Sequence, residues 1–89
     1  MDNEMNALKE MFSFISANPG ISYYDIAAIS YREEKDNWIR LLNDKKTRLL
    51  ISGYIKDVKR NNKVKYRRSM EESFEDYSKA QKEYLEKHS

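Results

Sequence analysis

Cysteine is absent from this 89-residue sequence, histidine occurs once, and glycine occurs only twice. Without cysteine the chain forms no disulfide and offers no thiolate for catalysis. The single histidine, His88, stands next to last, where chains usually fray, so a catalytic Ser-His-Asp arrangement is not expected. Two glycines are too few for a glycine-rich phosphate loop, and no metal-ligand spacing is present. These absences predict a protein that is not an enzyme and that uses no cofactor and no metal ion.

Long apolar runs and an apolar leader are also missing from the sequence. No stretch approaches the roughly 20 apolar residues that a membrane-spanning helix needs. The first ten residues are acidic and polar, unlike a signal peptide. The sequence therefore predicts a soluble, cytoplasmic protein that does not contact a membrane. It shows no sign of a ligand pocket, so no small-molecule ligand is expected.

Charge, in contrast, is abundant and unevenly distributed. Charged residues make up 36% of the chain and apolar residues 39%, which is typical of a helical domain with much exposed surface. The net charge is only +2, yet residues 56–68 carry a net charge of +6. Residues 1–30 and 69–89 each carry −3. This concentration of positive charge indicates an anionic partner.

Two helices are predicted in the N-terminal third of the chain. Residues 4–17 carry one apolar stripe at helical spacing, and the Asn-Pro-Gly turn at residues 18–20 ends that helix. A second, short helix begins after Ser22, because Asp25 stands three positions later and completes a capping box. This helix is expected to end near residue 30.

Residues 33–52 are predicted to be helical again, with Trp38 as an anchor of the core. In one straight helix Lys45 and Lys46 would fall on the same face as Trp38. We therefore expect a break near Asp44, which would N-cap a new helix. The alternative is one unbroken helix whose lysine stems run along the edge of the core.

The stretch after Gly53 predicts a two-stranded β-hairpin. Gly53 is a natural helix C-cap, and residues 54–60 have the composition of a strand. Asn61 and Asn62 tolerate the left-handed conformations of a tight turn, and residues 63–68 then alternate basic with apolar side chains.

Four features of this chain occur together: an Asn-Pro-Gly-Ile turn at 18–21, a Tyr-Asp-Ile-Ala helix at 24–27, Leu-Leu at 49–50 before Gly-Tyr-Ile at 53–55, and the basic hairpin. In this combination the chain resembles the winged-helix family of DNA-binding domains. The resemblance implies a mostly α fold with a small β-hairpin, the wing.

In this interpretation residues 1–89 form a single domain. Residues 21–68 make the winged helix-turn-helix, and additional helices lie at residues 1–17 and 69–88. The chain departs from the family in one respect, because residues 30–52, which join the second helix to Gly53, form a segment several residues longer than is usual in the family.

The resemblance implies two elements that contact DNA. The recognition helix is either residues 36–52 or residues 44–52, and its donors are expected in the major groove. These donors are Asn37, Arg40, Lys45, Lys46, Thr47 and Arg48. The wing is expected on phosphates or in the minor groove, through Lys56, Lys59, Arg60, Asn61, Asn62, Lys63, Lys65, Arg67 and Arg68. The alternative for both sets is an ordinary charged surface exposed to solvent.

The first and last helices each carry an apolar stripe that the central unit does not need. Ser69 caps the last helix, with Glu72 completing a second capping box. The two stripes pack on each other within one chain or pair across a two-fold axis, and the second arrangement predicts a homodimer. Its interface would contain Met5, Leu8, Phe12, Met70, Phe74, Tyr77, Tyr84 and Leu85.

Together these features predict a DNA-binding protein with double-stranded DNA as its partner. A small transcriptional regulator of phage, plasmid or viral type is the leading interpretation. The alternatives are a protein–protein interaction module that binds a host or replication protein, and a DNA-binding replication or partition protein.

Overall fold

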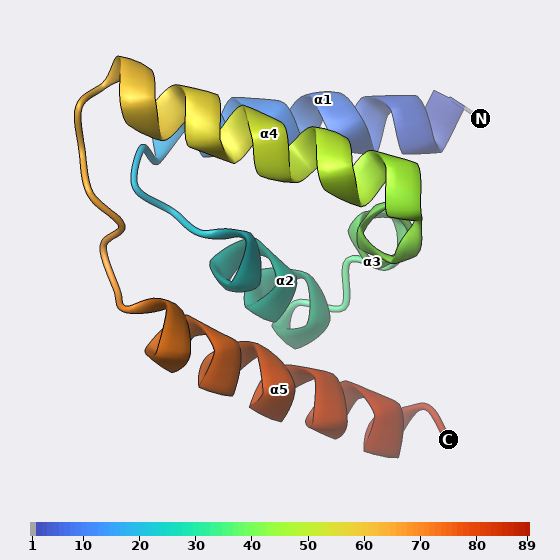
Figure 1. Ribbon diagram of the computed structural model, residues 1–89. Coiled ribbons are helices and arrows are strands. Elements are labelled where there is room, and N and C mark those ends of the chain that lie inside the picture. Colours follow the sequence, from blue (N-terminus) through green and yellow to red (C-terminus); the bar gives the residue numbers. More distant parts are fainter. Residues whose placement is uncertain (1) are drawn as a thin grey trace.

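Five α-helices make up the computed structural model, which describes residues 2–89 (Figure 1). Their bounds are α1 Asp2–Ala17, α2 Tyr23–Arg32, α3 Asp36–Asn43, α4 Lys45–Asn61 and α5 Met70–Lys87. α1 and α4 lie side by side and run in the same direction, and the short α3 packs at one end of the pair (Figure 1). α2 lies between this pair and α5 (Figure 1). No helix within the described residues is long and apolar enough to cross a membrane.

The main core is built by the first four helices. Met11 of α1, Ile26 of α2 and Ile51 of α4 are fully buried. Trp38 of α3 packs with them and is only 6% exposed, so its predicted role as a core anchor is confirmed. Burial of each such side chain contributes about 1.5–3 kcal/mol, so packing stabilises these short helices more than their intrinsic propensity does.

The last helix, α5, packs on α2 and runs parallel to it (Figure 1). Ala28 and Tyr31 of α2 form a second, small apolar cluster with Ala80 of α5. The ion pairs also reflect this parallel direction. Arg32 bonds to Asp76, near the middle of α5, at 2.7 Å. Glu34, two positions later in the chain, bonds to Lys87, near the end of α5, at 2.6 Å. Within residues 2–89, α5 does not pack against α1 or α4, so the two terminal helices do not pack on each other.

The predicted helix starts are confirmed by their caps. The hydroxyl of Ser22 accepts a hydrogen bond from the backbone of Asp25 at 3.2 Å, and the Asp25 carboxylate accepts one from the backbone of Ser22 at 3.0 Å. The break near Asp44 is also confirmed, since this residue N-caps α4. Ser69 caps α5 in the same way. Asn62, expected in a hairpin turn, is instead the C-cap of α4.

The predicted β-hairpin and the winged-helix fold are wrong, because residues 2–89 contain no β-strand. Residues 54–60, expected as the first strand, continue α4, and residues 63–68 have no strand to pair with. Ile51, Ile55 and Val58 recur at spacings of four and three, and they pack into the core from one face of α4. Burial of this face outweighs the strand propensity of the individual residues, which depends on having a partner strand.

Residues 62–69, called here the connector, lead from α4 to α5 past the turn at residues 18–20. The backbone N–H of Arg67 donates to the carbonyl oxygen of Gly20 at 3.0 Å. Gly20 has φ +96°, and a Cβ on it would lie 2.8 Å from the backbone oxygen of Lys65. Glycine is therefore required here both by backbone conformation and by the close approach of the connector.

Gly53 occupies a different environment, and the Gly53→Ala variant is expected to be more stable than the parent. Gly53 lies inside α4, is exposed, and a Cβ on it would meet nothing within 4 Å. Alanine should raise the free energy of unfolding by about 0.5–1 kcal/mol, because it restricts the unfolded chain more than glycine does. Thermal and urea unfolding followed by circular dichroism measure this change. A loss of stability would mean that Gly53 ends a helix instead of continuing one.

Candidate functional site

Ten lysines and arginines lie between residues 45 and 68, against one acidic residue, Asp57. We call residues 45–68 the cationic segment. It consists of α4, which lies beside α1 at the top of the view, and most of the connector, which descends from the end of α4 to the start of α5 (Figure 1). Residues 1–44 and 69–89 carry net charges of −4 and −3. The excess of positive over negative charge is thus confined to one continuous stretch of chain.

The structure distributes the predicted DNA contacts differently from a winged helix. The residues expected in the wing fall at the end of α4, namely Lys56, Lys59, Arg60 and Asn61, and in the connector, namely Asn62, Lys63, Lys65, Arg67 and Arg68. Those expected in the recognition helix fall in the first turn of α4, namely Lys45, Lys46, Thr47 and Arg48, and on α3, namely Asn37 and Arg40. The two sets therefore meet on α4, one helix of 17 residues.

Three of the predicted contacts are engaged within the chain. Arg40 donates to the side-chain oxygen of Asn37 at 2.9 Å. The backbone and hydroxyl of Thr47 both donate to the Asp44 carboxylate, at 3.0 and 2.8 Å, and these bonds lower the pKa of Asp44. Thr47 therefore strengthens the N-cap of α4 by donating to Asp44, and Arg40 forms its hydrogen bond to Asn37 within α3.

Arginines at the end of the cationic segment hold the fold together. Arg68 lies 3.2 Å from Asp76 and 3.6 Å from Asp25, and it thereby links the connector to both α5 and α2. A hydrogen bond from Arg32, together with the nearby guanidinium of Arg68, lowers the pKa of Asp76. Arg67 donates a hydrogen bond to the side-chain oxygen of Asn18 at 3.4 Å, and Arg60 pairs with Asp57 one turn earlier on α4.

Seven other cations of this segment have no such role. They form no ion pair within 4 Å with any side chain that the structure describes, and they are Lys45, Lys46, Arg48, Lys56, Lys59, Lys63 and Lys65. Most of them are exposed to solvent. They are consequently available to an anionic partner.

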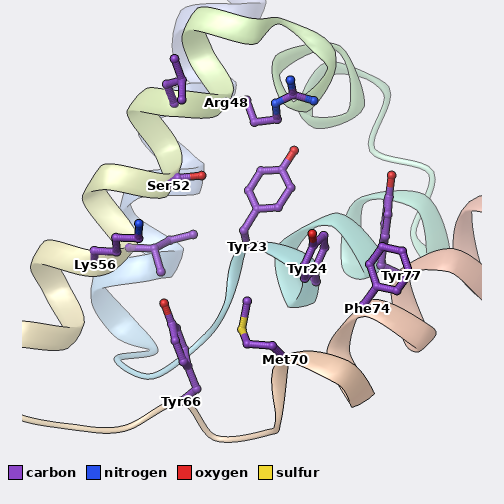
Figure 2. A pocket seen from close by; sticks show the side chains of 11 residues that line it. Tyr23, Tyr24, Arg48, Ser52, Lys56, Tyr66, Met70, Phe74 and Tyr77 are labelled. Carbon is purple, nitrogen blue, oxygen red and sulfur yellow. The ribbon is translucent and has the colours of Figure 1, made fainter.

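An open groove of about 490 Å³ lies between α4 and α5, with α2 as its floor (Figure 2). α4 contributes Arg48, Leu49, Ser52, Ile55 and Lys56, the connector and α5 contribute Tyr66, Met70, Phe74 and Tyr77, and α2 contributes Tyr23 and Tyr24. The cations therefore lie on the α4 side, and the rings lie on the floor and on the α5 side (Figure 2). The groove is mostly apolar with one cationic wall.

The rings of the groove pack on one another. Tyr24 stacks on Tyr77 with centroids 5.6 Å apart, and the edge of Phe74 meets Tyr24 at 5.1 Å. The Tyr23 hydroxyl donates to the carbonyl oxygen of Leu42 at 3.2 Å, and burial raises the pKa of Tyr23 to about 12. Burial also raises the pKa of Tyr77. Tyr23 and Tyr77 therefore stay neutral in the physiological range, and their rings act as apolar surface.

The residues expected in a dimer interface do not form one surface. Tyr77 and Tyr84 pack on α2 within the chain, and Leu8 and Phe12 pack on the main core. The other four are exposed, namely Met5 at 60%, Met70 at 42%, Phe74 at 47% and Leu85 at 55%. Two of these four, Met70 and Phe74, line the groove.

Sequence reasoning missed the groove because its residues come from four separate parts of the chain. In the sequence, Tyr24 falls in the predicted second helix, Leu49 in the predicted recognition helix and Tyr66 in the predicted second strand of the hairpin. The adjacent leucines Leu49 and Leu50 belong to α4, and by residue type both would be expected in the core. Both leucines are in fact exposed, at 65% and 54%.

Comparison with models of protein families, with curated protein sequences and with solved structures gives no match to this chain. Among the described residues, no group of three or more histidine, aspartate or glutamate side chains is placed to hold a metal ion. The function is therefore inferred from the cationic segment and the groove.

Proposed function

We propose that this chain is a small DNA-binding protein, of the kind that regulates transcription, and that it contacts phosphates through α4 and the connector. The observation that carries the proposal is the presence of seven cations in residues 45–68 whose side chains form neither an ion pair nor a hydrogen bond with a described residue. Elsewhere the chain uses cations to join helices, as in the pair between Arg32 and Asp76. A lysine or arginine that forms no ion pair within the protein and has few acidic neighbours can bind a phosphate group.

The shape of the cationic segment supports a duplex partner. α4 has 17 residues and is therefore about 25 Å long. Double-stranded DNA carries about one negative charge per 1.7 Å of its axis, so a helix of this length lies beside many phosphates. The acidic remainder of the chain repels the duplex and thus favours the orientation in which α4 and the connector face it. This is a binding function and requires no catalytic residue.

A titration of the protein with a fluorescent duplex at several salt concentrations tests the proposal. We expect binding near micromolar concentration at low salt. If five to seven of the seven cations contact phosphates, the log–log slope of affinity against salt should be roughly −5 to −6. The contrary result is absence of binding at micromolar concentration, or binding that salt does not weaken.

A further inference from the structure

We infer that the groove between α4 and α5 binds an amphipathic helix of another protein, one that carries carboxylates beside its apolar stripe. This goes beyond the DNA-binding function, because the partner is a protein and the surface is the inner side of α4. It assigns to the same small domain a second binding site, which shares Arg48 and Lys56 with the cationic segment.

Uncovered apolar side chains form the two lips of the groove. Leu49 on α4 is 65% exposed, and Met70 and Phe74 on α5 are 42% and 47% exposed. All three line the groove, and Met70 and Phe74 lie across it from α4, beyond the rings of Tyr23 and Tyr24 (Figure 2). Small proteins seldom gather several large apolar side chains around one concave surface unless a partner covers them. A helix laid between α4 and α5 would contact both lips at once.

The positive charges on one wall of the groove indicate where the partner helix carries its carboxylates. Arg48 and Lys56 lie on the α4 wall, eight positions and therefore about 12 Å apart. Neither forms an ion pair with a described side chain. On the opposite wall, residues 70–78 contain no lysine or arginine. A partner helix with carboxylates about two turns apart, on the side that faces α4, matches this arrangement.

The packing of the rings favours a peptide over a single strand of nucleic acid. Bases bind such grooves by stacking on free ring faces. Tyr24 already stacks on Tyr77, and the ammonium of Lys59 lies 4.4 Å from the ring centre of Tyr66. These contacts cover one face of each of the three rings, whereas the aliphatic side chains of Leu49 and Met70 are exposed and suit the leucine, isoleucine or phenylalanine side chains of a helix.

The test uses the full chain and a labelled synthetic peptide of about 17 residues, with leucines at i, i+3, i+4 and i+7 and glutamates along one flank. A second peptide has lysine in place of each glutamate. We expect the acidic peptide to bind with a Kd of about 10–100 µM by fluorescence anisotropy, and the basic peptide at least about tenfold more weakly. Equal affinity for the two peptides would overturn the inference.

Leu49 and Leu50 provide a matched pair of variants. Both are exposed, so neither substitution should unfold the chain, but only Leu49 lines the groove. Leu49→Ser should weaken binding of the acidic peptide about tenfold, whereas Leu50→Ser should change it less than about twofold. Equal effects of the two substitutions contradict the groove as the site. The Arg48→Glu, Lys56→Glu variant should prefer the basic peptide, and an unchanged preference also contradicts the inference.

Two further outcomes identify a different occupant and overturn the inference. If oligothymidine displaces the peptide and Leu49→Ser weakens oligothymidine binding, the groove binds single-stranded nucleic acid. If the wild type sediments as a dimer and Leu49→Ser as a monomer, a second copy of the chain fills the groove. Lys63 and Lys65 lie outside the groove, so loss of peptide binding and loss of duplex binding can be distinguished by different variants.

Discussion

The Lys63→Glu, Lys65→Glu variant is expected to bind duplex DNA about 10- to 100-fold more weakly than the wild type near 0.1 M salt. Both lysines are exposed in the connector and form no ion pair with a described side chain. Each reversal removes one phosphate contact and places a carboxylate in its position. The slope of log affinity against log salt should therefore become smaller by about 2. Fluorescence anisotropy at three or more salt concentrations measures both quantities.

A matched control is the Lys79→Glu, Lys82→Glu variant, which changes the net charge by the same amount. Its two lysines are exposed on α5, outside the cationic segment. This variant should bind duplex within about threefold of the wild type, because its charges lie outside the proposed contact surface and salt screens exposed charges that do not touch the duplex. If both variants lose affinity equally, binding follows net charge, and the proposed surface is wrong.

The second large effect concerns stability, where Gly20→Ala is expected to lower the free energy of unfolding by about 2–3 kcal/mol. A left-handed φ of +96° disfavours alanine, and the new Cβ would lie 2.8 Å from the backbone oxygen of Lys65. Backbone of the connector must move to relieve this contact. The shift also threatens the hydrogen bond from the Arg67 N–H to Gly20.

Thermal unfolding should show a decrease of roughly 10–20 °C in Tm for this variant. Gly53→Ala is the natural comparison, because the same substitution in the same protein should have the opposite sign there. A neutral effect at Gly20 would mean that the connector does not pack on the turn at residues 18–20.

Local signals in the sequence located the helix starts correctly. Ser22, Asp44 and Ser69 each offer a side-chain oxygen to backbone N–H groups that no helical carbonyl can reach, and this chemistry depends only on neighbouring residues. The end of α4 could not be found in the same way. Ile51, Ile55 and Val58 fit the spacing of a helix, whereas Tyr54, Ile55 and Val58 are also residue types that are common in strands. Only packing against α1 decides between these two patterns.

For the candidate site, composition was sufficient to find the cations but insufficient to distinguish their roles. Arg67 and Arg68 stand beside Lys63 and Lys65 in the sequence, yet Arg68 pairs with Asp25 and Asp76, while the lysines pair with no described side chain. Those aspartates belong to α2 and α5, so the distinction depends on the tertiary arrangement. The groove depends on the tertiary arrangement even more. α4 and α5 form its walls, although no Cα atom of one helix lies within 8 Å of a Cα atom of the other.

The parallel pairing of α2 with α5 has a consequence for the time course of folding. Arg32 and Asp76 are 44 positions apart, and Glu34 and Lys87 are 53 positions apart. Contacts of such long sequence separation form slowly, because a long loop must close first. During synthesis at about 5–20 residues per second, the outer face of α2, including Ala28 and Tyr31, remains uncovered for several seconds until α5 has been made. For that interval the nascent chain exposes an apolar surface that a chaperone can bind.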